Sequence, residues 1–378
     1  MSLAGQYRLH PGSHPSITGS RPVMGGACLG RLLRGRLGES VVQMLGSVFT
    51  LCAHAQRRTA RMVLYAAEQQ EHARVALEST HSLQMETTRD HLRSMALDWP
   101  QRQMGTTGNP AWLHWLAQCP VSLAAPSNAL TPAQATTQHV QLQAWLESTI
   151  LQMPIAQWLT DYRDEDAFSA WCAEAAERAT PLQCLTAWHT TARRLQPTTR
   201  TLDVLDVNAT QQAAQLRAIA QDLCANPDFA LRPLWLGACA ESGVWSRLRH
   251  RQAPGTVHSA WSRLQARWVE LLELARSPVE PQVSLLHSGA LPLGGGQAIA
   301  WCEMARGLLL HWVQLDDQHR VQDYRVLAPT EWNFHPDGAL AQALTQLHPP
   351  DATAAWCLTS AYDPCVDCSI HIQEIHHA

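Results

Sequence analysis

The spacing of apolar residues predicts that most of the chain is helical. Residues 53–98 lack glycine and proline and are rich in Ala, Gln, Arg, Glu and Leu, which favour helices. The residues that can form a buried stripe along this segment are Met62, Tyr65, Ala66, Val75 and Leu77. The pattern predicts one long helix that ends at Trp99 and Pro100, because proline disfavours helical geometry in the residue before it.

Further helices are predicted at 132–152, 165–178, 210–225 and 257–276. At the start of the first, Thr131 can cap the helix and Pro132 can take its first position, where a missing N–H costs little.

The clearest β pattern lies near the C-terminal third. Residues 307–315 and 320–328 are apolar and β-prone on either side of the polar segment 316–319, which predicts a hairpin with a four-residue loop. Glycine and proline predict an irregular lead-in over the first thirty residues and a flexible break at 291–296. The expected fold is therefore mainly α with a small β part.

Composition excludes several classes of function. The 378 residues are 46% hydrophobic and carry a formal charge of -4, which allows a large core and argues against a nucleic-acid partner. The chain contains no lysine, so mechanisms that need a lysine Schiff base or a phosphate-loop lysine are excluded.

The cysteines are expected to be free thiols or metal ligands. The N-terminus lacks an export signal and no apolar run is long enough to span a membrane, so we expect a cytoplasmic protein. Eleven cysteines spread over a long chain in a reducing compartment are not a disulfide framework.

The strongest candidate for chemistry is the segment 363–371, which contains Cys365, Cys368 and His371. Two thiols separated by two residues can reach one metal ion, and a nearby imidazole adds a third donor. A turn with incidental thiols is one alternative, and a structural zinc site completed by Cys357 or Cys52 is another. Spacing alone does not separate zinc from iron.

Two weaker candidates flank the predicted hairpin. Arg306, in the segment 303–307, offers a planar set of charged donors that suits an anion or a ligand with lone pairs, although it can equally be a surface arginine. Thr330 follows Pro329 in the segment 328–333, so its hydroxyl could donate in a fixed direction.

Taken in order, these segments resemble the large subunit of nickel–iron hydrogenases. Residues 360–371 match that family's DPCxxCxxH ligand motif, 303–311 resemble its EAPRG…H segment, and 328–333 resemble its APTxWN segment. The stretch from Gly30 to Cys52 is similar to its LKGR…RxCGxC region. The resemblance covers about a third of the chain and implies a helical-bundle core like that of the large subunit, with the β-hairpin near 307–328.

The departures from the family pattern bear on function. The resemblance implies that Cys52 and Cys368 are bridging thiolates that contact iron and that Cys365 is a terminal nickel ligand. Phe49 stands where the family has its first nickel-ligand cysteine, and Ala305 replaces a proline. Nickel would thus lose one of its four sulfur ligands, so nickel is not expected here.

This pattern resembles the HupK/HoxV-type hydrogenase maturation scaffolds. The resemblance implies a non-catalytic protein that transiently holds the iron dicyano-carbonyl group, with Cys52, Cys368, Arg306 and Thr330 around it. Arg306 and Thr330 would satisfy the cyanide nitrogens, with Pro329 and His371 nearby. The implied partners are hydrogenase maturation proteins and the immature hydrogenase large subunit.

Two alternatives remain open, a catalytic nickel–iron hydrogenase large subunit and a zinc-stabilised interaction protein. Both the maturation scaffold and the catalytic large subunit require the N- and C-terminal motifs to meet at one site. Residues 1–378 are therefore expected to form a single domain. Within it, 30–100 would carry the N-terminal motif and long helix, 101–290 a divergent helical middle, and 300–378 the hairpin and cysteine motif.

Overall fold

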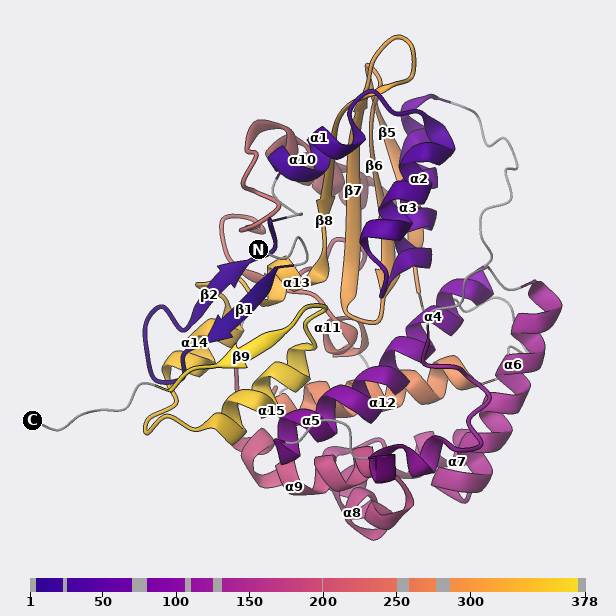
Figure 1. Ribbon diagram of the computed structural model, residues 1–378, viewed down its shortest axis with the longest axis vertical. Coiled ribbons are helices and arrows are strands. Elements are labelled where there is room, and N and C mark those ends of the chain that lie inside the picture. Colours follow the sequence, from indigo (N-terminus) through magenta and orange to yellow (C-terminus); the bar gives the residue numbers. More distant parts are fainter. Residues whose placement is uncertain are drawn as a thin grey trace, which may run out of the picture.

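The computed structural model shows an upper part built on a β-sheet, a lower bundle of helices, and a small sheet beside their junction (Figure 1). The structure describes residues 5–22, 26–69, 80–105, 110–124, 131–198, 200–249, 258–276 and 286–372.

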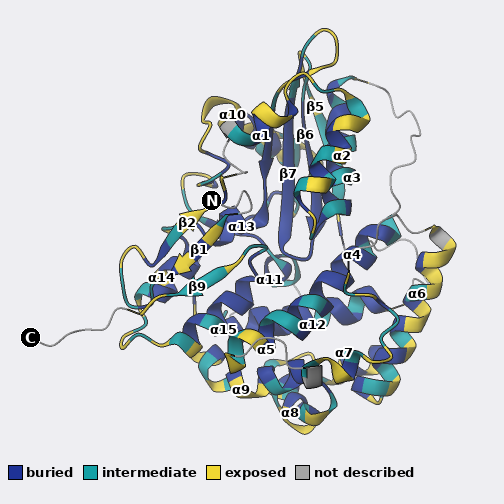
Figure 2. Cartoon of the chain, viewed as in Figure 1, coloured by how far each residue is buried: buried dark blue, intermediate teal, exposed yellow. Residues whose placement is uncertain are grey.

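The large sheet is an antiparallel meander of four strands in the order β5-β6-β7-β8. Its strands are β5 (Ser288–Gly294), β6 (Gln297–Met304), β7 (Gly307–Leu315) and β8 (Val321–Leu327). Strand β7 is buried almost throughout, which Figure 2 shows as a dark blue arrow, because both faces of the sheet are covered.

Different helices cover the two faces of this sheet. Helices α1 (Gly26–Leu33), α2 (Gly38–Val48) and α3 (Ala53–Ala67) pack with Ala300, Leu309 and other residues of one face. Helix α10 (Ala209–Ala225) packs with Leu310 and other residues of the opposite face. Alternate residues along each strand therefore serve two separate hydrophobic clusters.

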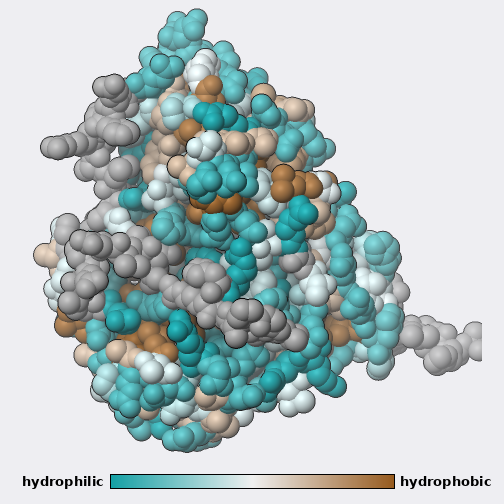
Figure 3. Space-filling view, turned by 180° about the vertical axis from the view of Figure 1, so that it is seen from behind, coloured by the Kyte–Doolittle hydropathy of each residue, from teal (hydrophilic) through white to brown (hydrophobic). Residues whose placement is uncertain are grey.

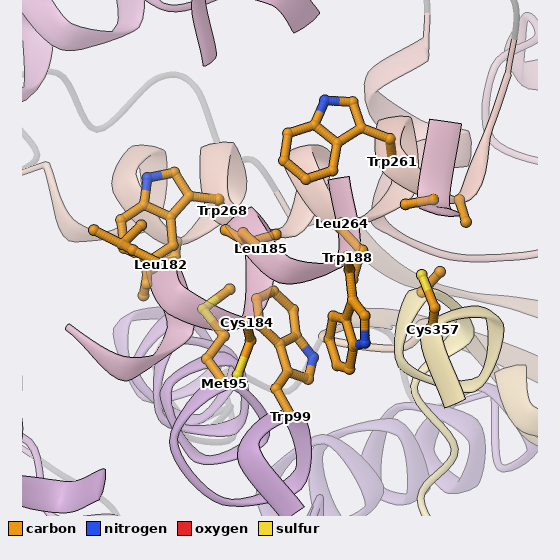
Figure 4. Packing of buried hydrophobic residues seen from close by; sticks show 14 of the residues in the cluster. Met95, Trp99, Leu182, Cys184, Leu185, Trp188, Trp261, Leu264, Trp268 and Cys357 are labelled. Atoms are coloured by element: carbon orange, nitrogen blue, oxygen red, sulfur yellow. The ribbon is translucent and has the colours of Figure 1, made fainter. Parts of the chain in front are cut away.

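The lower part is a helical bundle whose core is rich in tryptophan (Figure 4). Its main helices are α4 (Thr80–Arg93), α5 (Trp99–Met104), α6 (Pro132–Trp145), α7 (Ile155–Asp161), α8 (Glu165–Glu174), α9 (Thr180–Arg194), α12 (Ala260–Ala275) and α15 (Ala352–Tyr362). Trp99 and Trp188 meet edge to face with ring centroids 6.1 Å apart, an arrangement that aromatic pairs favour. This core holds α4, α12 and α15 together below the sheet.

The small sheet joins the two ends of the chain. Strand β1 (Gln6–Leu9) pairs with β2 (Ile17–Ser20) in antiparallel fashion and with β9 (Cys368–Ile370) in parallel. This pairing places the C-terminal cysteine motif next to the first strand (Figure 1).

Shorter elements complete the described chain. They are β3 (Arg200–Thr201), β4 (Ala240–Glu241), α11 (Val244–Leu248), α13 (Pro329–Asn333), α14 (Ala339–Thr345), the 3-10 turns Pro110–Leu116 and Ala176–Arg178, and the π-helical turns Ser94–Asp98 and Leu146–Leu151.

Several predictions from the hydrophobic pattern are confirmed. The hairpin of β7 and β8 lies within one residue of its predicted bounds, and the mainly α fold with a small β part is observed. Thr131 caps α6, where its hydroxyl accepts a hydrogen bond from the Gln134 N–H at 3.3 Å. The predicted helices at 165–178, 210–225 and 257–276 correspond to α8 with a following 3-10 turn, α10 and α12.

The predicted single helix at 53–98 is wrong. Helices α3 and α4 are separate, and residues 70–79 between them lie outside the described part. The helix also does not end at Pro100, because a π-helical turn leads into α5 and Pro100 occupies the first turn of that helix, where no N–H partner is lost.

Two segments predicted to be irregular contain strands. The lead-in forms β1 and β2, which pair with each other, and β1 also pairs with the distant β9. Because β9 lies at the other end of the chain, the local sequence gives little indication of these strands. The predicted flexible break at 291–296 is the end of β5 and its turn into β6, where Gly294, Gly295 and Gly296 supply the positive φ angles that the turn requires.

The surface seen from behind is mainly hydrophilic, with small separate hydrophobic areas (Figure 3). Across the described ranges, no helix combines the length and the apolar character needed to cross a membrane.

Replacing Gly307 with alanine is expected to destabilise the fold by at least about 2 kcal/mol, because the hairpin turn approaches the backbone of Ser242. Gly307 has φ +132°, and an added Cβ would meet the Ser242 hydroxyl and lie 2.8 Å from the Ser242 carbonyl carbon. Gly295→Ala is the control, since that Cβ meets no atom of the described residues within 4 Å and only its φ of +59° is unfavourable, costing about 1 kcal/mol. Denaturant unfolding checks both values, and equal losses would contradict the close contact.

Candidate functional site

Cys52 lies at the N-terminus of α3, where the helix meets α4. It precedes the helix directly and is 7% exposed. The backbone N–H groups of His54 and Ala55 donate to the two carboxylate oxygens of Glu86, each at 2.8 Å. Burial and the Glu86 carboxylate raise the pKa of the Cys52 thiol well above its usual range, so this thiol is protonated at neutral pH in the absence of a metal ion.

Phe49 lies just before this turn and belongs to the core rather than to a ligand set. It follows α2, is 6% exposed, and packs in the cluster between the sheet and helices α1 to α3. A benzyl ring has no donor atom, so this position cannot supply a metal ligand.

A short hydrogen-bond chain supports Cys52 from the sheet. The Gln56 amide donates toward the Cys52 sulfur at 3.7 Å, and its oxygen lies 2.9 Å from His311 Nε2 on β7. His311 Nδ1 is in turn 2.7 Å from the Tyr324 hydroxyl. Burial lowers the pKa of His311 to about 3, so the ring is neutral and keeps one donor and one acceptor nitrogen for this chain.

Arg306 occupies the tight turn between β6 and β7 and is buried, not at the surface. Its Nη1 donates to Asp90 Oδ2 at 3.2 Å, and its Nε lies 3.4 Å from Asp363 Oδ2. Burial alone would lower the pKa of Arg306, but the carboxylates of Asp363 and Asp90 raise it, so the guanidinium stays charged.

Asp363 anchors the start of the cysteine motif. Its carboxylate accepts hydrogen bonds from Ser94 at 2.7 Å and from Arg267 at 2.8 Å. Although burial disfavours the charge, Arg267 and Arg306 hold the pKa of Asp363 well below its usual value. The residue has φ +47°, a left-handed conformation that ends α15 and turns the chain toward Cys365.

Buried charges connect the two ends of the site. Arg89 donates to the Leu51 carbonyl at 2.7 Å and to Asp90 Oδ1 at 2.9 Å, while Arg306 contacts both Asp90 and Asp363. Leu51 precedes Cys52, and Asp363 lies two residues before Cys365. The chain of contacts therefore fixes the N-terminal and C-terminal cysteine segments to one group of buried side chains.

Cys365 lies beside the turn that follows the large sheet. Its sulfur is 3.1 Å from the hydroxyl of Thr330, which sits in the first turn of α13 next to the buried Pro329. A negative charge on Cys365 contributes to the raised pKa of Cys52 and of Arg306, so these three groups are close enough to interact electrostatically.

Cys368 begins β9 and is turned toward the bundle. It packs with Ile370 against the helical core and pairs with Tyr7 across the parallel ladder. Burial raises the pKa of the Cys368 thiol to about 12, and a charge on Cys365 would add to this rise.

His371 lies apart from the thiols. Side chains alternate between the two faces along a strand, so Ser369 and His371 are on the face opposite to Cys368 and Ile370. His371 is exposed, and its Nε2 is 2.9 Å from the Ser369 hydroxyl. The structure thus brings together Cys52, Arg306, Pro329, Thr330 and Cys365, with Cys368 nearby, and leaves His371 outside.

Arg21 is a residue of this site that sequence reasoning missed. Its Nη1 donates to both carboxylate oxygens of Glu331, at 3.1 and 3.2 Å, and both side chains are buried. Burial opposes its charge, but Cys365 and Glu331 raise the pKa of Arg21, so the guanidinium is close enough to both groups to interact electrostatically. Its sequence context, Ser20-Arg21-Pro22, gives no signal that distinguishes it from a surface arginine.

The thiols do not form a ready-made metal cage. Across the described ranges, no three His, Cys, Asp or Glu side chains are arranged so that they could hold one metal ion. Arg21 Nε is buried and has no hydrogen-bond acceptor among the described residues, whereas Arg306 Nε lies within ion-pair distance of Asp363 Oδ2. The site therefore combines thiols that do not form a cage with at least one buried N–H donor that a ligand with acceptor atoms could use.

Comparisons with known proteins show the family and the fold of the chain. Residues 260–371 match the family model for nickel-dependent hydrogenase. The hydrogenase expression/formation protein HoxV of Cupriavidus necator is 34% identical to this chain over 99% of its length and 97% of HoxV. The hydrogenase expression/formation protein HupK of Rhizobium leguminosarum bv. viciae is 29% identical over 92% of the chain and 90% of HupK.

A solved structure shares the fold. The nickel–iron–selenium hydrogenase of D. vulgaris Hildenborough superposes with a TM-score of 0.50 at 14% identity, covering 92% of each chain. The expected likeness of the fold to a hydrogenase large subunit is confirmed.

Replacing Asp363 with asparagine is expected to destabilise the protein by about 3–5 kcal/mol, because it leaves Arg267 and Arg306 with an uncompensated buried charge. Asparagine is nearly isosteric and tolerates the left-handed conformation, so the loss reports on charge. The matched control is Asp367→Asn, at an exposed position in the same segment.

The pH dependence of unfolding gives a second check on Asp363. Since its pKa is lowered in the folded state, its contribution is complete above the unfolded pKa of about 4 and is lost as pH falls further. The wild type should lose stability below pH 4 more steeply than Asp363→Asn. Parallel pH profiles for the two proteins would show that the ion pairs are not coupled to folding.

Proposed function

Because this chain belongs to the family of the hydrogenase expression/formation proteins HoxV and HupK, we propose that it acts in hydrogenase maturation as a non-catalytic scaffold. It transiently holds the iron dicyano-carbonyl fragment of the nickel–iron cofactor and passes this cargo to the hydrogenase large subunit. Its partners are hydrogenase maturation proteins and the immature large subunit, and its compartment is the cytoplasm.

The observation that carries this proposal is the convergence of the two cysteine segments. Arg89, Asp90 and Arg306 connect the carbonyl of Leu51 to Asp363 through buried contacts of 2.7 to 3.4 Å. These contacts link the segments that carry Cys52 and Cys365, although more than 300 residues separate the two cysteines in the sequence. Such convergence is what a shared ligand site requires.

The donor set fits an iron fragment that carries its own ligands. Iron with one carbonyl and two cyanides already has three strong ligands, so the thiolates of Cys52 and Cys368 are sufficient to hold it. Cyanide nitrogens accept hydrogen bonds. The candidate donors are Arg306 and Arg21, which are close enough to Cys52 and Cys365 to interact electrostatically, and the Thr330 hydroxyl, which lies 3.1 Å from the Cys365 sulfur. Pro329 and the apolar residues around it exclude water.

Binding this cargo must displace protons. Cys52 and Cys368 both have raised pKa values, so they are thiols before loading and become thiolates only when the iron replaces their protons. The charge that develops on Cys52 lies near Arg306 and Arg21, which stay protonated, and the charge on Cys368 lies near Arg102.

Phe49 separates this protein from a catalytic subunit. The family resemblance assigns a nickel ligand to this position, and the buried benzyl ring cannot coordinate a metal. An incomplete nickel sphere supports a carrier that releases its cargo, because fewer metal–sulfur bonds hold it less tightly.

Infrared spectroscopy of protein purified without oxygen from cells with the maturation machinery tests the proposal. The wild type should show carbonyl and cyanide stretching bands, and Cys52→Ala or Cys368→Ala should abolish them. Cys184→Ala, which removes a thiol from the bundle core, serves as the control and should retain the bands. Absence of bands from a folded wild type under these conditions would refute the cargo assignment.

Metal analysis of the same preparation separates the alternatives. The scaffold should contain iron without stoichiometric nickel. Nickel at close to one equivalent, with hydrogen-dependent dye reduction in the presence of an iron–sulfur partner, would indicate a catalytic subunit. Bound zinc and strong destabilisation by chelators would indicate a zinc-stabilised interaction protein.

A further inference from the structure

A small cavity lies beside Arg306, where the large sheet meets the helical bundle. Its wall is formed mainly by α11, by α12, by the end of α15 and by the turn between β6 and β7 (Figure 1). The cavity volume is about 20 Å³, which is enough for one ligand of about the size of a water molecule. Among the described residues that line it there is no cysteine, so this cavity is separate from the thiols.

Three buried guanidinium groups line this cavity, those of Arg263, Arg267 and Arg306. The one carboxylate among the described lining residues is that of Glu241, and its two oxygens already accept hydrogen bonds from Arg263 at 2.8 and 2.6 Å. Burial lowers the pKa of Arg267, and repulsion from Arg306 adds to this effect, although the Asp363 carboxylate opposes it. A negative charge in the cavity would therefore be favoured by its wall.

The polar groups of the wall include unused donors, whereas its side-chain acceptors are occupied. Arg267 Nε and Trp245 Nε1 are buried and have no hydrogen-bond acceptor among the described residues. By contrast, the Asn333 amide oxygen accepts from the Ser242 N–H at 3.0 Å, and the Ser242 hydroxyl accepts from the Leu308 N–H at 2.8 Å. An ion that only accepts hydrogen bonds suits this wall better than water, which also has two protons to donate.

We propose that this cavity is a binding site for a small monovalent inorganic anion such as chloride, held by the Arg267 Nε–H and the Trp245 indole N–H. A hydrogen bond between an ion and a charged donor is stronger than one between neutral groups, and the ion would satisfy two donors that are otherwise buried without a partner. The Arg263 guanidinium lies over the Trp245 ring, 4.5 Å from its centroid, and so holds the indole in position.

The anion would stabilise the junction between the sheet and the bundle. Its donors come from α11 and α12, and the cavity is bounded by the hairpin turn that carries Arg306. Because the ion binds these elements only when they are assembled, it raises the free energy of unfolding. This role does not depend on the iron cargo.

Thermal unfolding of the full-length protein in increasing sodium chloride tests the site, with sodium gluconate holding the ionic strength constant. The melting temperature of the wild type should rise with chloride, because gluconate is too large for the cavity. Trp245→Phe keeps an aromatic ring beside Arg263 and removes only the indole N–H, so chloride should bind at least about tenfold more weakly. The matched control is Trp99→Phe, which removes a buried indole N–H from the bundle core and should keep the wild-type response to chloride.

A second variant and a direct measurement complete the test. Arg267→Lys keeps a positive charge for Asp363 but lacks the Nε–H, so it should also weaken the response to chloride. Anomalous diffraction from wild-type crystals grown in sodium bromide should show a bromide peak between Arg267 and Trp245, and this result requires no variant to fold.

Two outcomes would overturn the site: a cavity without a bromide peak, and an equal response to chloride in Trp245→Phe and the wild type. The infrared bands of the iron cargo are an independent readout and should persist in Trp245→Phe. Failure of the anion site is therefore distinguishable from failure of the cargo assignment.

Discussion

The buried contacts of Arg306 with Asp90 and Asp363 are the interaction on which the site depends. Asp90 comes from α4, Asp363 from the end of α15, and Arg306 from the hairpin turn of the large sheet, so this one guanidinium connects the sheet to the helical bundle. Isolated buried charges are very unfavourable, and a buried pair is not in itself a source of much stability. These ion pairs instead fix the relative positions of α4, α15 and the hairpin turn, because the charges are compensated only when all three elements are in place.

The buried charges of this group are balanced against one another. Arg89, Arg267 and Arg306 face Glu86, Asp90 and Asp363, and burial together with Asp90 raises the pKa of Glu86 to about 7. The same surroundings keep Cys52 protonated. Metal binding that converts these thiols to thiolates would add negative charge to the group, and the arginines would compensate it.

The hydrophobic pattern predicted elements whose signal is local and missed those whose partner is distant. The hairpin of β7 and β8 and the Thr131 cap depend on residues a few positions apart, and both were predicted correctly. Strands β1 and β2 are short, and β1 is paired with β9 at the other end of the chain, so local sequence gave no indication of them. The passage of the helix through Pro100 follows from the π-helical turn Ser94–Asp98, which the local sequence did not reveal.

By itself the sequence determined the chemistry available to the protein: the thiols of Cys52, Cys365 and Cys368, the donors Arg306 and Thr330, and the ring of Phe49, which has no donor atom. Only the tertiary structure decided which residues share the site. It added Arg21, which is buried against Glu331, a residue 310 positions away in the sequence. It also placed His371 on the outer face of β9, away from the thiols. The physical reason is that a charged side chain is exposed unless a partner compensates it. Partners that lie far apart in the sequence meet only when the whole chain has folded.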